Sequence, residues 1–243
     1  MSLPPVHEIA QLIDHAILRP NFTREDVTRG LQLAADYNIF SVCVRPSDVE
    51  YAKTFFANAG SSVKVGTVVG FPHGVSTTET KAYETWDAAV NGADEIDMVI
   101  NISKAKDHDW GYIHDDISEV VITANEAGIE KVKVILETAY LTEEEIIEVS
   151  KISEQAGAHF VKTSTGFADE GATEPNLKLM RAAVSDHIEV KASGGVTSLE
   201  ILLSMRALGV SRFGTSATKT ILDDLEKQLT TGEKSSEVYA GKY

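Results

Sequence analysis

Three charged side chains stand inside otherwise apolar, strand-like segments of the chain. They are Asp97 in EIDMVI, Lys162 in HFVKTS and Lys191 in IEVKAS. A buried lysine is rare in proteins unless it is paired or functional. A structural ion pair explains any one of them equally well, but two lysines and a carboxylate on converging strands are harder to explain in this way. The pattern therefore indicates a reactive centre.

The chemistry that needs two neighbouring lysines is the formation of a Schiff base. An ammonium group cannot attack a carbonyl carbon, so the nucleophilic lysine must be neutral near pH 7. Burial and a second positive charge both lower a lysine pKa, and a change from about 10.4 to about 7 requires roughly 4 to 5 kcal/mol. Asp97, within reach of both amines, would carry protons during dehydration and carbon–carbon bond cleavage.

A second group of candidate residues follows the last three predicted strands, in three short segments rich in glycine and hydroxyl side chains. Backbone N–H groups in such loops, with hydroxyls and a helix N-terminus behind them, form a cradle for anions. Each loop by itself is explained equally well as a simple turn. Together they predict a phosphate site formed by Gly166, Gly194, Gly195, Gly214, Thr215 and Ser216.

The elements that must position these residues alternate along the whole chain. Short β-branched segments are separated by longer stretches with helical patterning, which is typical of βαβ units and a parallel sheet. Helix starts are marked by Thr23 with Asp26, by Ser76 with Glu79, and by Thr142 before acidic residues. The predicted strands are residues 12–18, 40–44, 63–69, 95–100, 131–136, 159–164, 188–193 and 211–216.

Eight strands, each followed by a helix, predict an α/β fold of the (β/α)8 TIM-barrel type in a single domain. We expect residues 1–231 to form this barrel, with a short N-terminal helix, and residues 232–243 to form a flexible tail. A doubly wound open sheet is the alternative. The G-x-G-x-x-G segment that usually follows the first strand of such a sheet is absent.

The charge balance excludes several classes of partner. The 243 residues contain 22 Lys and Arg against 37 Asp and Glu, a net charge of −15, so a nucleic-acid or anionic-membrane binder is not expected. The single cysteine, Cys43, fits a reducing compartment, and the N-terminus does not resemble a secretory signal, so we expect a cytoplasmic protein. The histidines lack the spacing of a metal site, so we expect no metal and no other cofactor.

At these positions the sequence resembles the deoxyribose-phosphate aldolases, which are class I aldolases with a barrel fold. The similarity extends over nearly the whole chain. The matching segments are DHAILRP (14–20), SVCVRP (41–46), VVGFPHG (68–74), EIDMVIN (95–101), KVILET (133–138), VKTSTGF (161–167), KASGGV (191–196) and RFGTS (212–216).

The resemblance implies reversible cleavage of 2-deoxy-D-ribose 5-phosphate to acetaldehyde and D-glyceraldehyde 3-phosphate, without a metal. It also implies roles for individual residues of this chain. Lys162 matches the Schiff-base nucleophile, Lys191 the lysine that tunes it, and Asp97 the proton shuttle. Thr165 would help to hold a relay water, and Tyr243 matches a C-terminal tyrosine that reaches back to the site.

Three departures from the family pattern affect the substrate end of the site. Phe167 and Thr197 stand where some relatives carry Lys and Arg, and Ala16 stands where a threonine is commoner. One alternative is therefore the same chemistry on a different or unphosphorylated aldehyde pair. Another is a sugar-phosphate-binding barrel that is not an aldolase and uses the lysines as electrostatic clamps. The sequence leaves the oligomeric state open, with a homodimer as the assembly considered.

Overall fold

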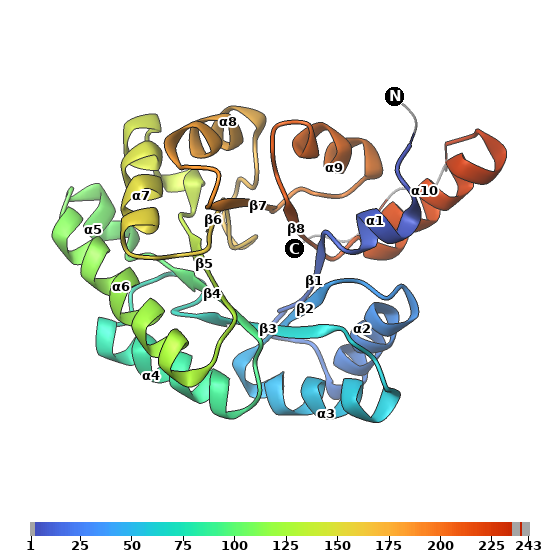
Figure 1. Cartoon of the computed structure of the whole chain (residues 1–243), viewed down its shortest axis with the longest axis horizontal. Helices are drawn as coiled ribbons and strands as arrows, with labels where there is room; N and C mark the ends of the chain where they lie inside the picture. Colours follow the sequence, from blue (N-terminus) through green and yellow to red (C-terminus); the bar gives the residue numbers. More distant parts are fainter. Residues whose placement is uncertain (1–2, 235–238, 240–243) are drawn as a thin grey trace.

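The computed structural model describes residues 3–234 and Tyr239. Eight parallel strands close into a barrel in the order β1-β2-β3-β4-β5-β6-β7-β8, and helices surround it (Figure 1). The predicted (β/α)8 barrel is confirmed. No helix in the described part of the chain is both long and apolar enough to cross a membrane.

The strands are short and the helices between them vary in length. The strands are β1 (Ile13–Ile17), β2 (Ser41–Val44), β3 (Lys64–Val69), β4 (Glu95–Val99), β5 (Lys131–Ile135), β6 (Phe160–Lys162), β7 (Glu189–Ser193) and β8 (Arg212–Thr215). The helices are α1 (Val6–Ala10), α2 (Arg24–Asp36), α3 (Val49–Ala59), α4 (Thr78–Val90), α5 (Ile102–Lys106), α6 (Trp110–Ala127), α7 (Glu143–Gln155), α8 (Glu174–Ala183), α9 (Leu199–Arg206) and α10 (Thr218–Thr231). Two 3₁₀ turns, η1 (Pro46–Asp48) and η2 (Thr138–Tyr140), follow β2 and β5.

The helix starts are set by side chains that accept hydrogen bonds from the free N–H groups of the first turn. Thr23 begins α2 in a capping box with Asp26, as predicted. Thr142 begins α7 as predicted, and the structure adds a capping box with Glu145 there. The start predicted at Ser76 is wrong by one residue. Thr77 begins α4 because its backbone is extended and its hydroxyl accepts a hydrogen bond from the Thr80 N–H.

The core has two layers because alternate strand residues point to opposite sides of the sheet. One set points outward and packs against the helices, and these side chains, such as Val132 and Val134 in β5, are apolar and fully buried. The other set points into the barrel and includes Lys133, which is bonded to Asp97 of β4. The barrel interior is therefore charged, and the apolar core lies between the sheet and the helices.

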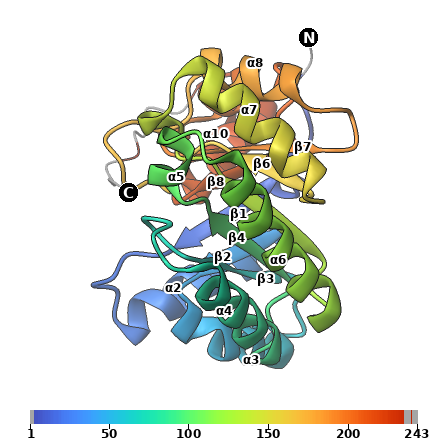
Figure 2. The same ribbon diagram turned by 90° about the vertical axis from the view of Figure 1, so that its left-hand side faces the viewer.

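Between β4 and β5 the chain forms two helices, α5 and α6, and α6 packs against α4 (Figure 2). The contact between α4 and α6 contains a fully buried ion pair, with Lys81 Nζ 2.5 Å from Asp116 Oδ2. Thr78 donates a further hydrogen bond to the same carboxylate. A buried pair of this kind must be kept intact, since removing one partner leaves an uncompensated charge.

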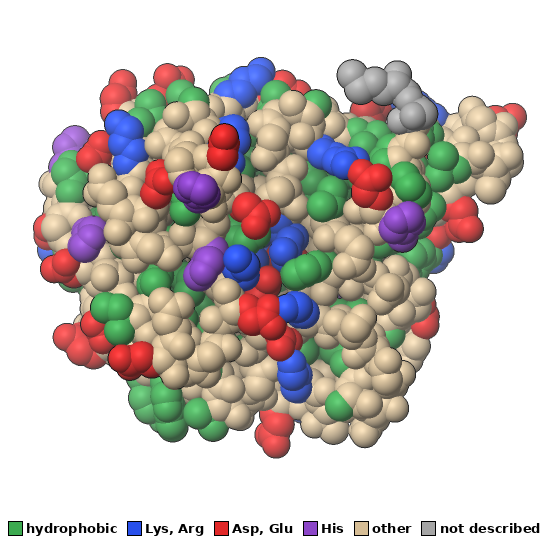
Figure 3. Space-filling model, viewed as in Figure 1, with side chains coloured by type: hydrophobic (Ala, Val, Ile, Leu, Met, Phe, Trp, Pro, Cys, Tyr) green, Lys and Arg blue, Asp and Glu red, His purple; other side chains and the backbone are tan. Residues whose placement is uncertain are grey.

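Surface charge of both signs is distributed over the molecule. Figure 3 shows acidic side chains around the rim of one face, and a mixed group of Lys, Arg and acidic side chains near its middle. The net charge of −15 therefore coexists with local positive charge. This matters for the site, because the lysines predicted to be reactive lie inside the barrel rather than on this surface.

Candidate active site

Seven charged side chains from six strands meet inside the barrel. The strand register explains the meeting, because Asp97 of β4 stands beside Lys133 of β5, and Lys162 of β6 stands beside Lys191 of β7. All seven are buried, with at most 7% of each residue exposed. They are Asp14, Glu95, Asp97, Lys133, Lys162, Lys191 and Arg212.

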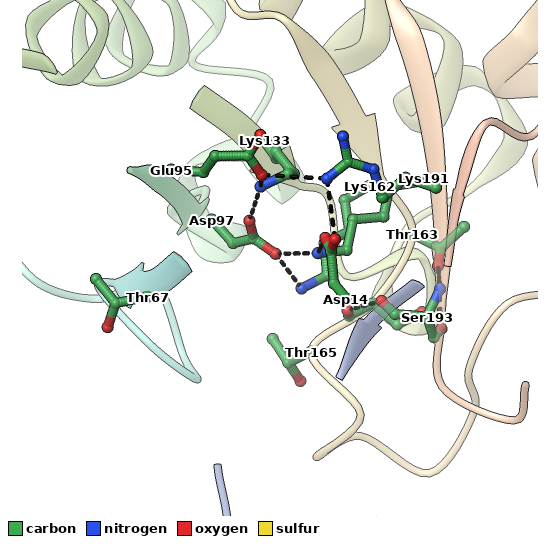
Figure 4. A network of polar contacts seen from close by, with 12 residues as sticks. Asp14, Thr67, Glu95, Asp97, Lys133, Lys162, Thr163, Thr165, Lys191 and Ser193 are labelled. Carbon is green, nitrogen blue, oxygen red and sulfur yellow. Dashed lines mark hydrogen bonds and ion pairs between the residues drawn. The ribbon is translucent and has the colours of Figure 1, made fainter. Parts of the chain in front are cut away.

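Asp97 lies at the centre of this cluster and contacts three lysines (Figure 4). Its Oδ2 is 2.7 Å from the Nζ atoms of both Lys162 and Lys191, and its Oδ1 is 2.9 Å from Lys133 Nζ. The three residues predicted from the sequence are thus brought together at hydrogen-bond distance. A proton on either lysine amine can reach the other through one carboxylate oxygen.

Two further carboxylates, Asp14 and Glu95, contact two of the three lysines but not the third. Asp14 Oδ2 is 2.5 Å from Lys191 Nζ, and Glu95 Oε2 is 2.7 Å from Lys133 Nζ. Lys191 and Lys133 therefore each have two carboxylate partners. Among the described residues, Lys162 has one, which is Asp97. Arg212 bridges Asp14 and Glu95 at 2.9 and 3.2 Å.

Because the three lysines have different numbers of carboxylate partners, their pKa values change in different directions. Burial lowers the pKa of each, because it disfavours the charged amine. For Lys191 the carboxylates of Asp14 and Asp97 outweigh burial and raise the pKa. For Lys133 the carboxylates of Asp97 and Glu95 do the same. For Lys162 burial prevails, assisted by the positive charge of Lys191, and the pKa is lowered.

Asp97 is held in its ionised form. Burial by itself would raise its pKa, but the charges of Lys133, Lys162 and Lys191 outweigh burial and bring the pKa well below the ordinary value. The carboxylate is therefore an acceptor that holds a proton only briefly. This property suits a group that passes protons between amines.

The sequence-based prediction did not include three members of the cluster, Lys133, Asp14 and Glu95, or the nearby residue Glu137. Lys133, Asp14 and Glu95 each stand in or beside an apolar strand segment, in the same way as Asp97, so the signal was present in KVKVIL, LIDHAIL and DEIDMVI. Glu137, at the end of β5, carries a left-handed backbone, with φ 54° and ψ 64°, which no sequence pattern announced. It lies beside the predicted residue Thr165.

Thr165 is turned toward Glu137. Its backbone N–H lies 3.2 Å from Glu137 Oε1, and its hydroxyl donates a short hydrogen bond to Glu137 Oε2. Burial raises the pKa of Glu137 despite these hydrogen bonds and the nearby charges of Lys162 and His73. A threonine and a buried carboxylate thus form a second polar pair next to Lys162.

Four of the predicted phosphate residues, Gly166, Gly194, Gly195 and Ser216, lie in the loops after β6, β7 and β8. Gly214 and Thr215, predicted to follow the last strand, are part of β8 itself, and several of the six have packing roles. A Cβ on Gly214 would come within 2.9 Å of Ser193 Cβ and 3.4 Å of Lys191 Cε, so this glycine makes room for the lysine. Gly194 lies against Gly171, where no side chain fits. The Thr215 hydroxyl is engaged with the Val196 carbonyl and the Ala217 N–H.

The remaining predicted phosphate residues lie nearer the solvent. Gly166 and Gly195 have φ angles of 86° and 81°, the left-handed conformation that favours glycine. Ser216 lines a cavity of about 170 Å³ and its hydroxyl is 2.5 Å from the Tyr239 hydroxyl. Tyr243, predicted to reach the site, lies outside the described residues.

The 170 Å³ cavity is lined by a positively charged side chain, Arg19, which was not among the residues predicted from the sequence. Arg19, which is half-buried, lies at its wall with its guanidinium 5.9 Å from the Phe22 ring centre. No carboxylate in the described part of the chain forms an ion pair with Arg19. The cavity is lined by Ala16, Leu18, Arg19, Phe22, Phe167, Ser216 and Tyr239.

A larger and mainly apolar cavity, of about 520 Å³, adjoins the first at Leu18 and Phe167. Phe71 and Phe167 meet edge to face in its wall, with ring centres 5.3 Å apart. Cys43 lies in a small apolar cluster next to it, and burial raises the pKa of its thiol to about 11. The open end of the barrel thus has a smaller cavity that includes Arg19 and the Ser216 hydroxyl, and a larger, mainly apolar cavity beside it.

Comparisons with known proteins show the family of the chain. The family described as DeoC/LacD family aldolase matches residues 8–213. A relative named deoxyribose-phosphate aldolase from Staphylococcus epidermidis is 50% identical over 217 residues, which cover 89% of this chain and 96% of the relative. One of the same name from Thermococcus gammatolerans is 46% identical over 216 residues, again 89% of this chain and 96% of the relative.

Two solved structures extend the likeness to three dimensions. An aldolase named QR15 has a TM-score of 0.86 and 35% identity, covering 93% of this chain and 99% of its own. A tetrameric deoxyribose phosphate aldolase from Aeropyrum pernix has a TM-score of 0.84 and 28% identity, covering 91% of this chain and 92% of its own.

Proposed function

The chain belongs to the DeoC/LacD family of aldolases, and on this basis we propose that it is a class I deoxyribose-phosphate aldolase. It cleaves 2-deoxy-D-ribose 5-phosphate reversibly to acetaldehyde and D-glyceraldehyde 3-phosphate, through a Schiff base on a lysine. The assignment of the residues rests on one observation. Of the three lysines around Asp97, Lys162 alone has a single carboxylate partner within the described structure and a lowered pKa.

Lys162 is the nucleophile in this mechanism. Its neutral Nζ attacks the C1 carbonyl of the open-chain sugar, and loss of water from the carbinolamine gives the protonated imine. The bond between C2 and C3 then breaks, its electrons move into the imine, and the C3 hydroxyl loses its proton. Glyceraldehyde 3-phosphate leaves, the enamine is protonated at C2, and hydrolysis releases acetaldehyde and restores the amine.

Asp97 and Lys191 support these steps. Asp97 Oδ2 lies 2.7 Å from both amines, so it can take a proton from the nitrogen of the carbinolamine and return it. Lys191 remains charged, because Asp14 and Asp97 raise its pKa. Its charge stabilises the ionised Asp97 and disfavours a second ammonium on Lys162.

The substrate phosphate binds in the 170 Å³ cavity in this proposal. Arg19 supplies positive charge there and the hydroxyl of Ser216 supplies a donor, and an arginine–phosphate contact is stronger than a neutral hydrogen bond. Arg19 would take over from the cations that Phe167 and Thr197 replace. A substrate phosphate would have to displace the Tyr239 hydroxyl from Ser216.

The apolar cavity supports a second candidate function within the same chemistry. Its apolar lining residues, such as Val68, Phe71 and Phe167, favour an unphosphorylated, apolar aldehyde, and its lining arginine, Arg45, is paired with Asp48. The rates with phosphorylated and unphosphorylated deoxyribose separate the two candidates. Equal kcat/KM values would overturn the assignment of the phosphorylated substrate.

Covalent trapping tests the mechanism directly. Borohydride reduction in the presence of acetaldehyde should leave an ethyl group on the peptide that contains Lys162, detected by mass spectrometry. The Lys162→Arg variant should give no adduct while keeping its fold. An adduct on another peptide, or none in the wild-type protein, would refute the Schiff-base assignment.

We also propose that two copies associate through the α4–α6 face. Three exposed apolar side chains lie on one side of α4, namely Tyr83, Trp86 and Val90. Val75, before this helix, and Ile122 of the neighbouring α6 are exposed as well, and the exposed fractions of the five residues are 47–71%. Adjacent exposed apolar side chains of this kind mark interaction surfaces on soluble proteins. We place the enzyme in the cytoplasm, where its single cysteine, Cys43, would remain a free thiol.

A further inference from the structure

Glu137 has an unusual position for a charged residue. Its backbone is left-handed, a conformation that residues with a side chain seldom adopt, and it is 2% exposed. The flanking residues fix it to the strand that carries the nucleophile, because the Leu136 N–H donates to the Lys162 carbonyl at 2.9 Å and the Thr138 N–H to the Thr163 carbonyl at 3.0 Å. A strained, buried carboxylate is thus held beside Lys162.

The contacts of Glu137 determine what the Thr165 hydroxyl can do. That hydroxyl donates its single proton to Glu137 Oε2, and its oxygen accepts a hydrogen bond from the Phe167 N–H at 3.0 Å. A hydroxyl oxygen has two lone pairs, so one acceptor position is left and no donor. Any water or substrate hydroxyl that meets Thr165 must therefore donate to it.

We propose that Glu137 is a positioning residue for the hydrolysis of the imine, because it fixes the Thr165 hydroxyl as an acceptor and takes the proton that this hydroxyl passes on. The proposal rests on the Schiff-base function of Lys162 set out above. It adds a second route for protons, through Thr165 and Glu137, to the one through Asp97.

The step balances in atoms and charge. A water bonds through its oxygen to the imine carbon, and the π electrons of the C=N bond move to the nitrogen, which becomes a neutral amine. One proton of the water passes to Thr165 Oγ1 while the Thr165 proton passes to Glu137. The cationic imine and the anionic Glu137 become a neutral carbinolamine and a neutral carboxylic acid. Carbinolamine dehydration runs the same step backwards.

The surroundings of Glu137 fit a group that gains and loses a proton. Burial raises its pKa, and this effect outweighs the hydrogen bonds from Thr165 and the charges of Lys162 and His73 that face it. A carboxylate with a raised pKa is a better proton acceptor than an ordinary one. Asp97, which three lysines keep ionised, serves the transfer of protons between the amines instead.

Glu137→Gln and Thr165→Val test the proposal singly and together. Glutamine can still accept from the Thr165 hydroxyl but cannot take its proton. We expect each single variant to lower kcat on the order of 100-fold, with KM changed less than about threefold. The double variant should be no slower than Thr165→Val, since residues that act through one another are not additive.

Glu145→Gln is the matched control, because Glu145 is a carboxylate of similar burial, 4% exposed, that caps α7 and contacts Lys106. It should lose thermal stability and keep both kcat and the pH profile. Glu137→Asp retains an ionisable acceptor and should recover part of kcat with an acid limb in its pH profile. Glu137→Gln should lose that limb.

The outcomes separate this inference from the proposed function. Trapping with acetaldehyde and borohydride should still modify Lys162 in Glu137→Gln, since the nucleophile is intact. Independent, multiplicative effects of the two substitutions would overturn the relay, and so would a Glu137→Gln enzyme with a lower melting temperature and an unchanged pH profile. Failure to trap Lys162 in the wild-type protein would instead refute the Schiff-base function itself.

Discussion

Lys191→Met removes a positive charge from the cluster while keeping an unbranched side chain of nearly the same length. In the described structure the cluster contains four cations and three carboxylates, and it is electrically neutral when one lysine is deprotonated. After the substitution three cations face three carboxylates. Lys162 must then stay charged to keep the balance, so we expect its pKa to rise.

The size of the effect follows from the contacts. Both amines lie 2.7 Å from Asp97 Oδ2, so the Nζ atoms of Lys162 and Lys191 are at most twice that distance apart. At about 5.4 Å and an effective dielectric constant of about 20, two positive charges repel by about 3 kcal/mol. Removing this repulsion should reduce the neutral fraction of Lys162 on the order of 100-fold, over the pH range in which it is mainly protonated.

The assay is the pH dependence of kcat/KM for the cleavage reaction, with the rate of borohydride trapping as a second measure. In Lys191→Met the rise of activity with pH should move to higher pH, and raising the pH should restore much of the lost rate. Lys81→Met is the control, because it breaks a buried ion pair on α4. It should lower stability without moving the profile.

A profile that stays in place while activity falls would refute the reasoning. It would mean that Lys191 acts by contact with the substrate and not through the charge of Lys162. Circular dichroism and thermal unfolding must accompany the assay. The substitution leaves Asp14 with fewer partners, and a broken buried pair costs about 3 to 5 kcal/mol.

Two further predictions follow from the surface of the barrel. Arg19→Met should lower kcat/KM for 2-deoxyribose 5-phosphate about 10- to 100-fold, because a charge-assisted hydrogen bond is lost. The kcat/KM for unphosphorylated deoxyribose should stay unchanged. An equal fall of kcat/KM for both substrates would contradict the role of Arg19 in phosphate binding. Trp86→Glu should convert a particle of two chains into one of a single chain by light scattering, because it puts a charge on the exposed α4 face. Tyr140→Glu changes another exposed aromatic residue, on η2, and should not alter the mass. A Trp86→Glu protein of unchanged mass would refute the proposed interface.

The barrel could be predicted from the sequence because the evidence for each strand and helix lies within a few neighbouring residues. Strand residues alternate and helix starts carry their own caps, so eight units could be placed without knowing how they meet. The error at Ser76 is of the same local kind, since two adjacent hydroxyl residues can each begin a helix and only the backbone angle of Thr77 decides between them. Lys162, Lys191 and Asp97 were found by charge in apolar segments, which is also a local signal.

Which lysine is reactive could not be predicted from those segments alone. That choice depends on how many carboxylates each amine contacts, and the carboxylates come from β1 and β4, which are distant in sequence from the lysines. The same holds for Arg19, whose place beside Ser216 exists only because β1 pairs with β8 when the barrel closes.

By itself the sequence determined the fold, the family and the three residues at the centre of the cluster, because periodicity and residue type act over a few positions. The tertiary structure decided the protonation of each group and the partner of Thr165. Those properties depend on electrostatic interactions over a few ångströms between residues such as Lys191 and Asp14, which are 177 positions apart. Glu137 belongs to the same class, since its strained backbone is maintained by contacts with the neighbouring strand.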